Sequence, residues 1–245
     1  MPVTEGVITL LILALASALQ AGTGFGFALM AIPVLSMSVN PVDAIAIVAL
    51  AGGVMTAHAS YRDRKYVDAA VTMRFCIGSL VGLPIGLGLL LLMTETAITA
   101  MIGVVVLVSV GAIHFGAHLP NNAPAHWTAG ALSGAMMTST GINGPPLVLT
   151  LHAMQLAQRP FRAALSVAFT FQRVMTLILF VLTDALSAQA VWLSLLGIPA
   201  ILLGWELGNR VFHRLDATRF KRVVEVLLVL SAAFCLIRAL SPLSG

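Results

Sequence analysis

Charged side chains are scarce in this chain of 245 residues. Thirteen Lys and Arg together with nine Asp and Glu make up 9% of the sequence, whereas a soluble domain carries about 25%. This scarcity excludes an ordinary soluble fold. Hydrophobic residues make up 59%, and the mean hydropathy is +1.02. At roughly 20 residues for each spanning helix, the chain has room for about six to eight such helices. The composition predicts an all-α polytopic membrane protein.

Cysteines and catalytic signatures are also scarce or missing. The two cysteines, Cys76 and Cys235, each lie in an apolar run without metal-ligand spacing, so we expect neither a disulfide nor a metal site. The sequence has no HExxH, GxSxG or Walker motif, and we therefore expect no enzyme activity and no cofactor. The net charge of +4 comes from short clusters between apolar runs, which is typical of topology signals rather than of a nucleic-acid partner.

The apolar sequence divides into eight runs, and two of them are too long for one straight span. The first and fifth exceed 30 residues, about 50 Å of helix against a hydrocarbon core of about 30 Å. Glycine clusters interrupt both, at 22–26 and at 138–146, where glycine flexibility and proline oppose a continuous helix. Both runs therefore predict broken helices. The runs are 5–38, 42–60, 69–92, 96–117, 127–156, 161–183, 188–209 and 221–240.

The two interruptions indicate an internal repeat. Residues 23–26 match 140–143 at an offset of 117 residues, and 40–44 match 159–163 at an offset of 119. Gly82 and Gly86 match two further glycines, Gly204 and Gly208, at an offset of 122. These matches predict a first repeat over 1–117, a linker over 118–126 and a second repeat over 127–245. Chance similarity between glycine- and alanine-rich helices is the alternative.

Basic residues cluster in three connections, 61–74, 159–162 and 210–222. If every run crossed the membrane once, the first cluster would lie opposite the other two, against the positive-inside rule. If the two long runs are re-entrant helical hairpins, all three clusters are cytoplasmic. Each half then contains one hairpin and three transmembrane helices, and the second half is inverted relative to the first, as in many secondary transporters. Eight simple crossings are the alternative.

The interruptions also mark the expected site, because non-helical backbone at membrane depth is tolerated where protein buries it or where it lines a wet cavity. Half-helices that begin there direct free amides and positive dipole ends toward an anion. The alternative is that these small residues serve close helix packing, which we prefer for the scattered glycines. The candidate substrate-binding residues are Gln20, Thr23, Gly24, Phe25, Gly26, Thr138, Ser139, Thr140, Gly141, Asn143 and Gly144.

Arg173 is the most informative charge. It lies 12 residues beyond Phe161, about 18 Å into an apolar run, and a cation at that depth is costly unless it meets a cavity, a partner or a substrate. We expect it to balance the charge of a bound anion; a structural pair with a carboxylate is the alternative. His58 and His152 lie near the ends of their runs, where protonation could couple transport to a proton gradient, although interfacial histidines also occur there.

These residues resemble a known family. The glycine-rich segment 22–26 followed by Pro33, its second copy at 141–145, Arg162-Ala163, and 204–208 followed by 220–222 are similar to the sulfite exporter TauE/SafE family, also called the toluene sulfonate uptake permease family. The likeness covers essentially the whole chain. It implies transport of sulfite, sulfoacetate or another organosulfonate across the bacterial cytoplasmic (inner) membrane. Phe25 and Asn143 stand where many relatives have glycine, which indicates a cavity tuned to a particular anion.

The expected mechanism is alternating access by a secondary transporter in which a small anion binds between the two hairpin tips. A passive anion channel would share the hairpins, and a structural or assembly subunit would use the glycines only for packing; both remain alternatives. Membrane lipid is the surrounding partner. The sequence leaves the particular anion, the transport direction, the coupling ion and a homodimer open.

Overall fold

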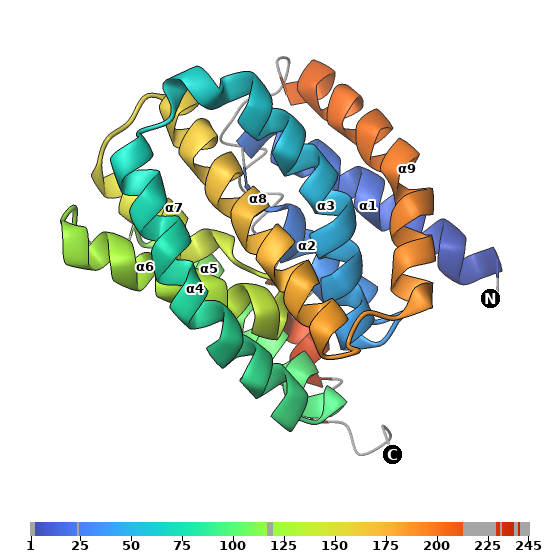
Figure 1. Ribbon diagram of the computed structural model, residues 1–245. Helices are drawn as coiled ribbons and strands as arrows, with labels where there is room; N and C mark the ends of the chain where they lie inside the picture. Colours follow the sequence, from blue (N-terminus) through green and yellow to red (C-terminus); the bar gives the residue numbers. More distant parts are fainter. Residues whose placement is uncertain are drawn as a thin grey trace.

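The computed structural model describes residues 3–23, 25–116, 120–212, 229–230, 232–237 and 240. Every regular element in these ranges is helical (Figure 1), which confirms the all-α prediction. The elements are α1 (Val3–Thr23), α2 (Phe27–Leu35), α3 (Pro41–Asp63), the short 3₁₀ turn η1 (Arg64–Tyr66), α4 (Ala69–Leu92), α5 (Glu95–His114), α6 (Ala123–Thr140), α7 (Gly144–Ala153), α8 (Gln158–Leu182) and α9 (Ala188–Phe212).

Five helices of the described ranges are long and apolar enough to cross a membrane: α3 extended by η1, α4, α5, α8 and α9. Large apolar side chains on their outer faces confirm a lipid-facing surface; Val81 on α4 is 62% exposed and Leu203 on α9 is 66% exposed. Exposed large apolar side chains occur on all five of these helices, whereas a soluble monomer exposes only small apolar patches. The chain is therefore a multi-pass membrane protein. Most of the predicted run 221–240 lies outside the described residues.

Polar residues at the ends of the apolar runs begin the helices. Asn40 Oδ1 accepts from Val42 N at 2.8 Å, Asp68 Oδ1 from Ala70 N at 3.0 Å, and Asn122 Oδ1 from Ala125 N at 2.9 Å. Each bond satisfies an amide that the first helical turn cannot. These caps fix where α3, α4 and α6 begin. Between the caps, buried apolar side chains from different helices form one large cluster and two smaller ones.

Both long runs are broken, as predicted. The first ends as α1 at Thr23 and resumes as α2 at Phe27, where Gly26 has a φ of 106°. The second ends as α6 at Thr140 and resumes as α7, and Gly141 at that end has a φ of 72°. Glycine adopts such left-handed conformations without steric cost. Two prolines occupy the first turn of α7, where their missing amide hydrogens are tolerated.

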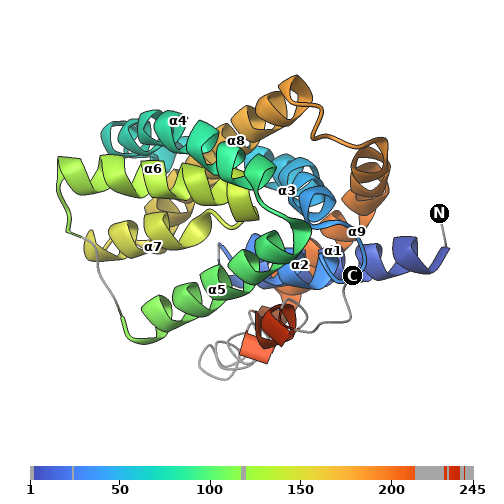
Figure 2. The same ribbon diagram turned by 90° about the horizontal axis from the view of Figure 1, so that it is seen from below.

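Three pairs of helices make the most extensive contacts in the fold. α4 lies along α6 and α1 lies along α9, while α3 and α8 pack on each other between these two pairs (Figures 1 and 2). In the α4–α6 pair, the spanning helix α4 belongs to the first predicted half and the broken run α6 to the second. In the α1–α9 pair, the broken run α1 belongs to the first half and the spanning helix α9 to the second. The broken run of each half therefore packs on a spanning helix of the other half.

Glycines make both of these interfaces close. A methyl group on Gly82 of α4 would overlap the carbonyl oxygen of Ala131 in α6, and one on Gly204 of α9 would overlap the carbonyl oxygen of Ala14 in α1. Small residues of this kind allow helix backbones to approach in membranes. The packing role preferred for the scattered glycines is confirmed at these positions. Ala14 and Ala131 are separated by the same 117 residues as the two interruptions.

Candidate functional site

The two breaks meet at one small cavity beside the middle of α8. Its volume is about 10 Å³, which is space for about one water molecule. Residues from α1, from both breaks, from the first turn of α2 and from α8 surround it. They are Gln20, Gly26, Phe27, Ala28, Leu29, Ile142, Asn143, Gly144, Phe169 and Arg173.

Arg173 is buried at this cavity with few partners. Its side chain is 2% exposed, and its Nη1 donates to Thr56 Oγ1 at 3.4 Å, longer than an ordinary hydrogen bond. Its Nε has no hydrogen-bond partner, and Arg173 forms no ion pair with any carboxylate of the described residues. The guanidinium carbon lies 5.8 Å from the centre of the Phe27 ring. A buried cation of this kind is costly unless a counter-charge binds beside it.

A polar network holds the second break against α8. Asn143 Nδ2 donates to Gln172 Oε1 at 2.7 Å, and Ser133 Oγ of α6 donates to the Asn143 carbonyl at 2.6 Å. All three side chains are at most 2% exposed. Gln172 Nε2 has no partner, so a second unused donor lies in the chain next to Arg173. Buried donors normally find acceptors; of these two, Arg173 is the one that lines the central cavity.

The start of α2 adds backbone donors. No side chain caps this helix, and its first internal hydrogen bond runs from Met30 N to the Gly26 carbonyl at 3.1 Å. The amides of Phe27, Ala28 and Leu29 therefore have no acceptor inside α2, and all three residues line the cavity. An uncapped helix N-terminus favours an anion. α7 contributes fewer amides because its first turn contains two prolines.

The structure brings five predicted site residues together at the cavity: Gln20, Gly26, Asn143, Gly144 and Arg173. The side chain of Thr23 and all of Gly24 lie outside the described residues. Phe25, which precedes Gly26 in the chain, lines a different cavity. The sequence reasoning did not select Ser133, Thr56 or Phe27, because a small hydroxyl or an apolar ring in a helix carries no local signal of such a role.

Four other candidates do not line the central cavity. Thr138 Oγ1 donates to the Leu83 carbonyl of α4 at 2.7 Å. Ser139 and Thr140 donate to carbonyls one turn earlier in α6, at 2.7 Å and 2.9 Å, as hydroxyls inside helices commonly do. A side chain at Gly141 would meet Ile32. The hydroxyl hydrogens of Thr138, Ser139 and Thr140 are therefore already donated to backbone carbonyls.

Both histidines proposed for proton coupling are exposed. His58 lies near the end of α3, and neither histidine lines the central cavity. His152 lies in the last turn of α7, and its ring packs edge-on against the Phe161 ring with the ring centres 5.1 Å apart. His152 and Phe25 both line a second cavity of about 410 Å³. Its other lining residues are Leu151, Gln155, Leu156, Gln158 and Phe161.

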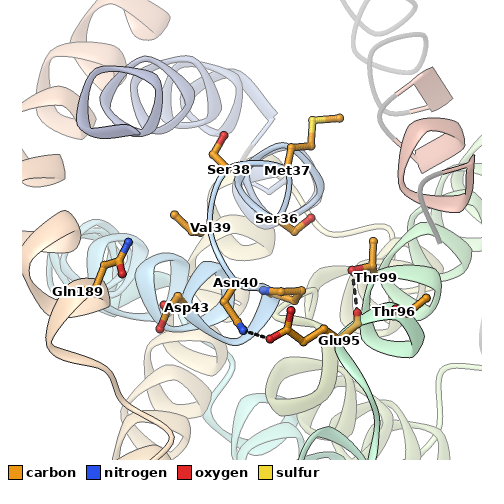
Figure 3. Close-up of a pocket in the computed structure, with 11 residues that line it drawn as sticks. Ser36, Met37, Ser38, Val39, Asn40, Asp43, Glu95, Thr96, Thr99 and Gln189 are labelled. Atoms are coloured by element: carbon orange, nitrogen blue, oxygen red, sulfur yellow. Dashed lines mark hydrogen bonds between the residues drawn. The ribbon is translucent and has the colours of Figure 1, made fainter. Parts of the chain in front are cut away.

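A third cavity of about 490 Å³ opens where α2 leads into α3, where α5 begins and where α9 begins (Figure 3). Figure 3 shows the Asn40 amide pointing to the Glu95 carboxylate, to which it donates a hydrogen bond. Asp43 also lines this cavity and accepts from Ser187 Oγ at 2.6 Å. None of the residues that line it carries a positive charge, so its lining is acidic.

The two larger cavities lie at opposite ends of α3. The third cavity surrounds Asn40, where α3 begins. The second cavity lies where α8 begins, and there Arg159 Nη1 donates to Tyr66 OH at 3.1 Å, just beyond the far end of α3. The segments 40–44 and 159–163, which the sequence pairs, thus lie at or beside the two cavities. The small central cavity lies at the helix breaks.

The comparisons with known proteins add one match. A family model described as "Sulfite exporter TauE/SafE" matches residues 9–235. This range covers both breaks, α3 to α9 and every described residue of the central cavity. No curated protein and no solved structure matches the chain.

Proposed function

Because the chain belongs to the sulfite exporter TauE/SafE family, whose model matches residues 9–235, we propose that it is a secondary transporter of a sulfur-containing anion. Sulfite, sulfoacetate and other organosulfonates are the candidate substrates. The observation that carries this proposal is the buried Arg173, whose Nε lacks a partner and which lies at a cavity bounded by both helix breaks. A bound oxyanion supplies both the missing acceptor and the missing counter-charge.

The donors around the cavity suit an oxyanion with several oxygens. Arg173 provides the charge, and the free amides at the start of α2 provide preorganised dipoles, which are most effective where water is excluded. Asn143, which lines the cavity, is held in place by Gln172 through the bond at 2.7 Å. None of the cavity-lining residues is acidic, so nothing there repels an anion.

The size of the central cavity favours a transporter over an open channel. Space for about one water, roughly 10 Å³, cannot hold an anion of four or more heavy atoms. Binding therefore requires the two breaks to move apart. We propose the larger cavities at opposite ends of α3 as the openings toward the two sides. The third cavity, with Asp43 and Glu95 in its lining, holds an anion less well than the second, whose lining residues include no carboxylate. Alternating access, in which one half rocks against the other, uses all three cavities.

The packing supports an inverted repeat as the basis of this motion. Ala14 and Ala131 are 117 residues apart, and the glycines they face, Gly204 and Gly82, are 122 apart. Gly208 faces Ala18 as Gly86 faces Ala135, and these residues are separated by the same two offsets. A two-fold relation between the halves produces two interfaces of this kind, in which matched residues contact each other with the halves exchanged. We propose repeats over 1–117 and 127–245, joined by the linker 118–126.

The function is tested by flux in proteoliposomes. We expect radiolabelled sulfite or an organosulfonate to enter with saturable kinetics, and we expect the purified protein to be thermally stabilised by the same anion, since a ligand stabilises the state that it binds. Flux that rises linearly with concentration and ignores a proton gradient would support the passive channel. No flux and no thermal shift with any sulfur-containing anion would leave the structural subunit as the better description.

The membrane topology needs its own test. We propose that the basic segments 61–74, 159–162 and 210–222 are cytoplasmic, in the bacterial inner membrane, and that both broken runs re-enter on the side from which they came. In a variant with Cys76 and Cys235 replaced by serine, single cysteines at the exposed positions 64 and 159 are expected to react only with a reagent that reaches the cytoplasm. Cysteines at Thr94 and Asp184, also exposed, are expected to react from outside. Labelling of positions 64 and 159 from opposite sides would instead show eight simple crossings.

A further inference from the structure

The guanidinium of Arg173 lies directly against Gly52 of α3. A Cβ atom on Gly52 would lie 2.5 Å from Arg173 Nη1, 2.8 Å from Arg173 Cζ and 2.9 Å from Cε1 of Phe27. These separations are shorter than carbon and nitrogen atoms tolerate without bonding. The guanidinium therefore fits where it does because residue 52 has no side chain. Gly52 itself is buried.

Gly52 differs from the glycines of the α4–α6 and α1–α9 interfaces. A methyl group on Gly78, Gly82 or Gly204 would meet a backbone carbonyl of the neighbouring helix first, so those glycines allow helices to pack closely. The three atoms nearest to a Cβ on Gly52 all belong to side chains that line the central cavity. Close packing of α3 on α8 is therefore not what this glycine provides.

Two neighbours complete the contact. Thr56, one turn after Gly52, accepts from Arg173 Nη1 at 3.4 Å and donates its own hydrogen to the Gly52 carbonyl at 3.1 Å. The Phe27 ring lies 5.8 Å from the guanidinium carbon. We call Gly52, Thr56 and Phe27 the arginine seat. All three are neutral, so the seat locates the cation without cancelling its charge.

We propose that Gly52 is a positioning residue for Arg173, and that the arginine seat sets how far the guanidinium projects toward the central cavity, and hence the affinity for the anion and the largest anion accepted. This inference rests on the proposed function. A side chain at residue 52 pushes the guanidinium away from α3. The central cavity has only about 10 Å³ to spare, so the displaced group takes space that the anion needs. Larger anions lose more than smaller ones.

The seat also joins the two halves of the chain. Gly52 and Thr56 belong to α3 in the first predicted half, whereas Arg173 belongs to α8 in the second. The bond from Arg173 to Thr56 is long, at 3.4 Å, and an anion that accepts from the guanidinium competes with it easily. The position of Arg173 thus depends on how α3 and α8 lie against each other, which is what a rocking motion changes.

The chain offers a matched control for a test. Gly53 is the next residue of the same helix, and a Cβ there would have nothing within 4 Å. Both glycine-to-alanine changes raise helix propensity equally, so only the contact with Arg173 differs between them. We expect Gly52→Ala to raise the KM for sulfite flux roughly tenfold, about the effect of losing one charge-assisted hydrogen bond. The KM for a larger organosulfonate should rise further, and the maximal rate should change far less. Gly53→Ala should leave both parameters unchanged.

A second variant keeps the test decisive if Gly52→Ala does not fold. Thr56→Val removes the only side-chain acceptor of the seat at nearly constant volume, and it should raise the KM by about threefold, as expected for a weak hydrogen bond. If neither variant raises the KM above that of Gly53→Ala, the positioning role is wrong, although flux that depends on Arg173 would still support the proposed function. If the wild-type protein shows no anion flux and no thermal shift, the proposed function fails, and the positioning role fails with it.

Discussion

Replacing Arg173 with methionine is expected to stabilise the protein and to reduce the efficiency of saturable anion transport strongly. The stability gain arises because the guanidinium is 2% exposed, has an unpartnered Nε and forms no ion pair with a described carboxylate. Removing a buried charge that lacks a partner relieves its desolvation cost, and we expect a gain within the range of about 1–4 kcal/mol found when buried ion pairs are exchanged for apolar side chains of similar volume. Methionine is unbranched and flexible enough to fill the same space.

The unpartnered charge of Arg173 that lowers stability is also the reason why its removal is expected to impair transport. If a bound anion supplies the missing counter-charge, the methionine variant offers it only backbone and amide donors. Each hydrogen bond to a charged group contributes about 1.5–3 kcal/mol, so the loss of the charge and its donors is expected to reduce transport efficiency by roughly a hundredfold or more. A residue with a merely structural role would change stability and transport in the same direction.

Two variants control this experiment. Arg173→Lys keeps the charge but loses the planar fork of donors, and it should retain part of the flux. Arg64→Met removes an exposed cation and should change neither flux nor melting temperature noticeably. Melting temperature in one detergent and flux in proteoliposomes are the measurements. A methionine variant that transports normally would show that Arg173 does not contact the anion, and one that unfolds would show that the guanidinium is structurally required.

The sequence predicted the parts of this architecture that depend on residue type alone. The scarcity of charge indicated a membrane protein, and glycine and proline clusters indicated breaks at 22–26 and 138–146, close to where α1 and α6 end. Depth along an apolar run selected Arg173. Each of these features follows from the chemistry of a single segment, because a helix cannot continue through Gly141 in a left-handed conformation or through two prolines.

The rotation of each helix could not be predicted from residue type. Thr138 was expected to contact an anion, yet it donates to α4. In hindsight the spacing carries a signal, because Gly130, Gly134 and Thr138 recur every four residues and so share one helix face. Methyl groups on the two glycines would meet α4 at Phe75 and Ser79. This small-residue face therefore packs on α4 and cannot also line the cavity.

Tertiary contacts also separate residues that look equivalent in the sequence. Gly52 and Gly53 are adjacent in one apolar helix, but only Gly52 touches Arg173. Asn143 was expected to bind substrate directly, and it does line the cavity, but its amide donates to Gln172. The sequence could name the polar residues near the breaks. It could not show which of their donors are already used by another group of the protein.

The largest loss of stability is expected from alanine at Gly82 or Gly204. In both cases the added methyl overlaps a backbone carbonyl oxygen, of Ala131 and of Ala14 respectively. A carbonyl in a helix cannot rotate away, so the two helices must separate along their length, and overpacking of this kind costs about 1–3 kcal/mol and occasionally more. Gly88→Ala in α4 is the control, because nothing lies within 4 Å of its Cβ. That variant should be neutral or slightly more stable.

The comparison between the two variants tests the proposed repeat. If α4–α6 and α1–α9 are the same interface with the halves exchanged, Gly82→Ala and Gly204→Ala should lower the melting temperature by similar amounts. Shortening Ala131 to glycine should not rescue Gly82→Ala, because the obstacle is the backbone oxygen rather than the alanine side chain. A Gly204→Ala variant as stable as Gly88→Ala, beside a strongly destabilised Gly82→Ala, would show that the two interfaces are not equivalent. The offsets of 117 and 122 residues would then be chance similarity between glycine- and alanine-rich helices. A true repeat requires glycine at both residue 82 and residue 204, because the same interface occurs in both halves.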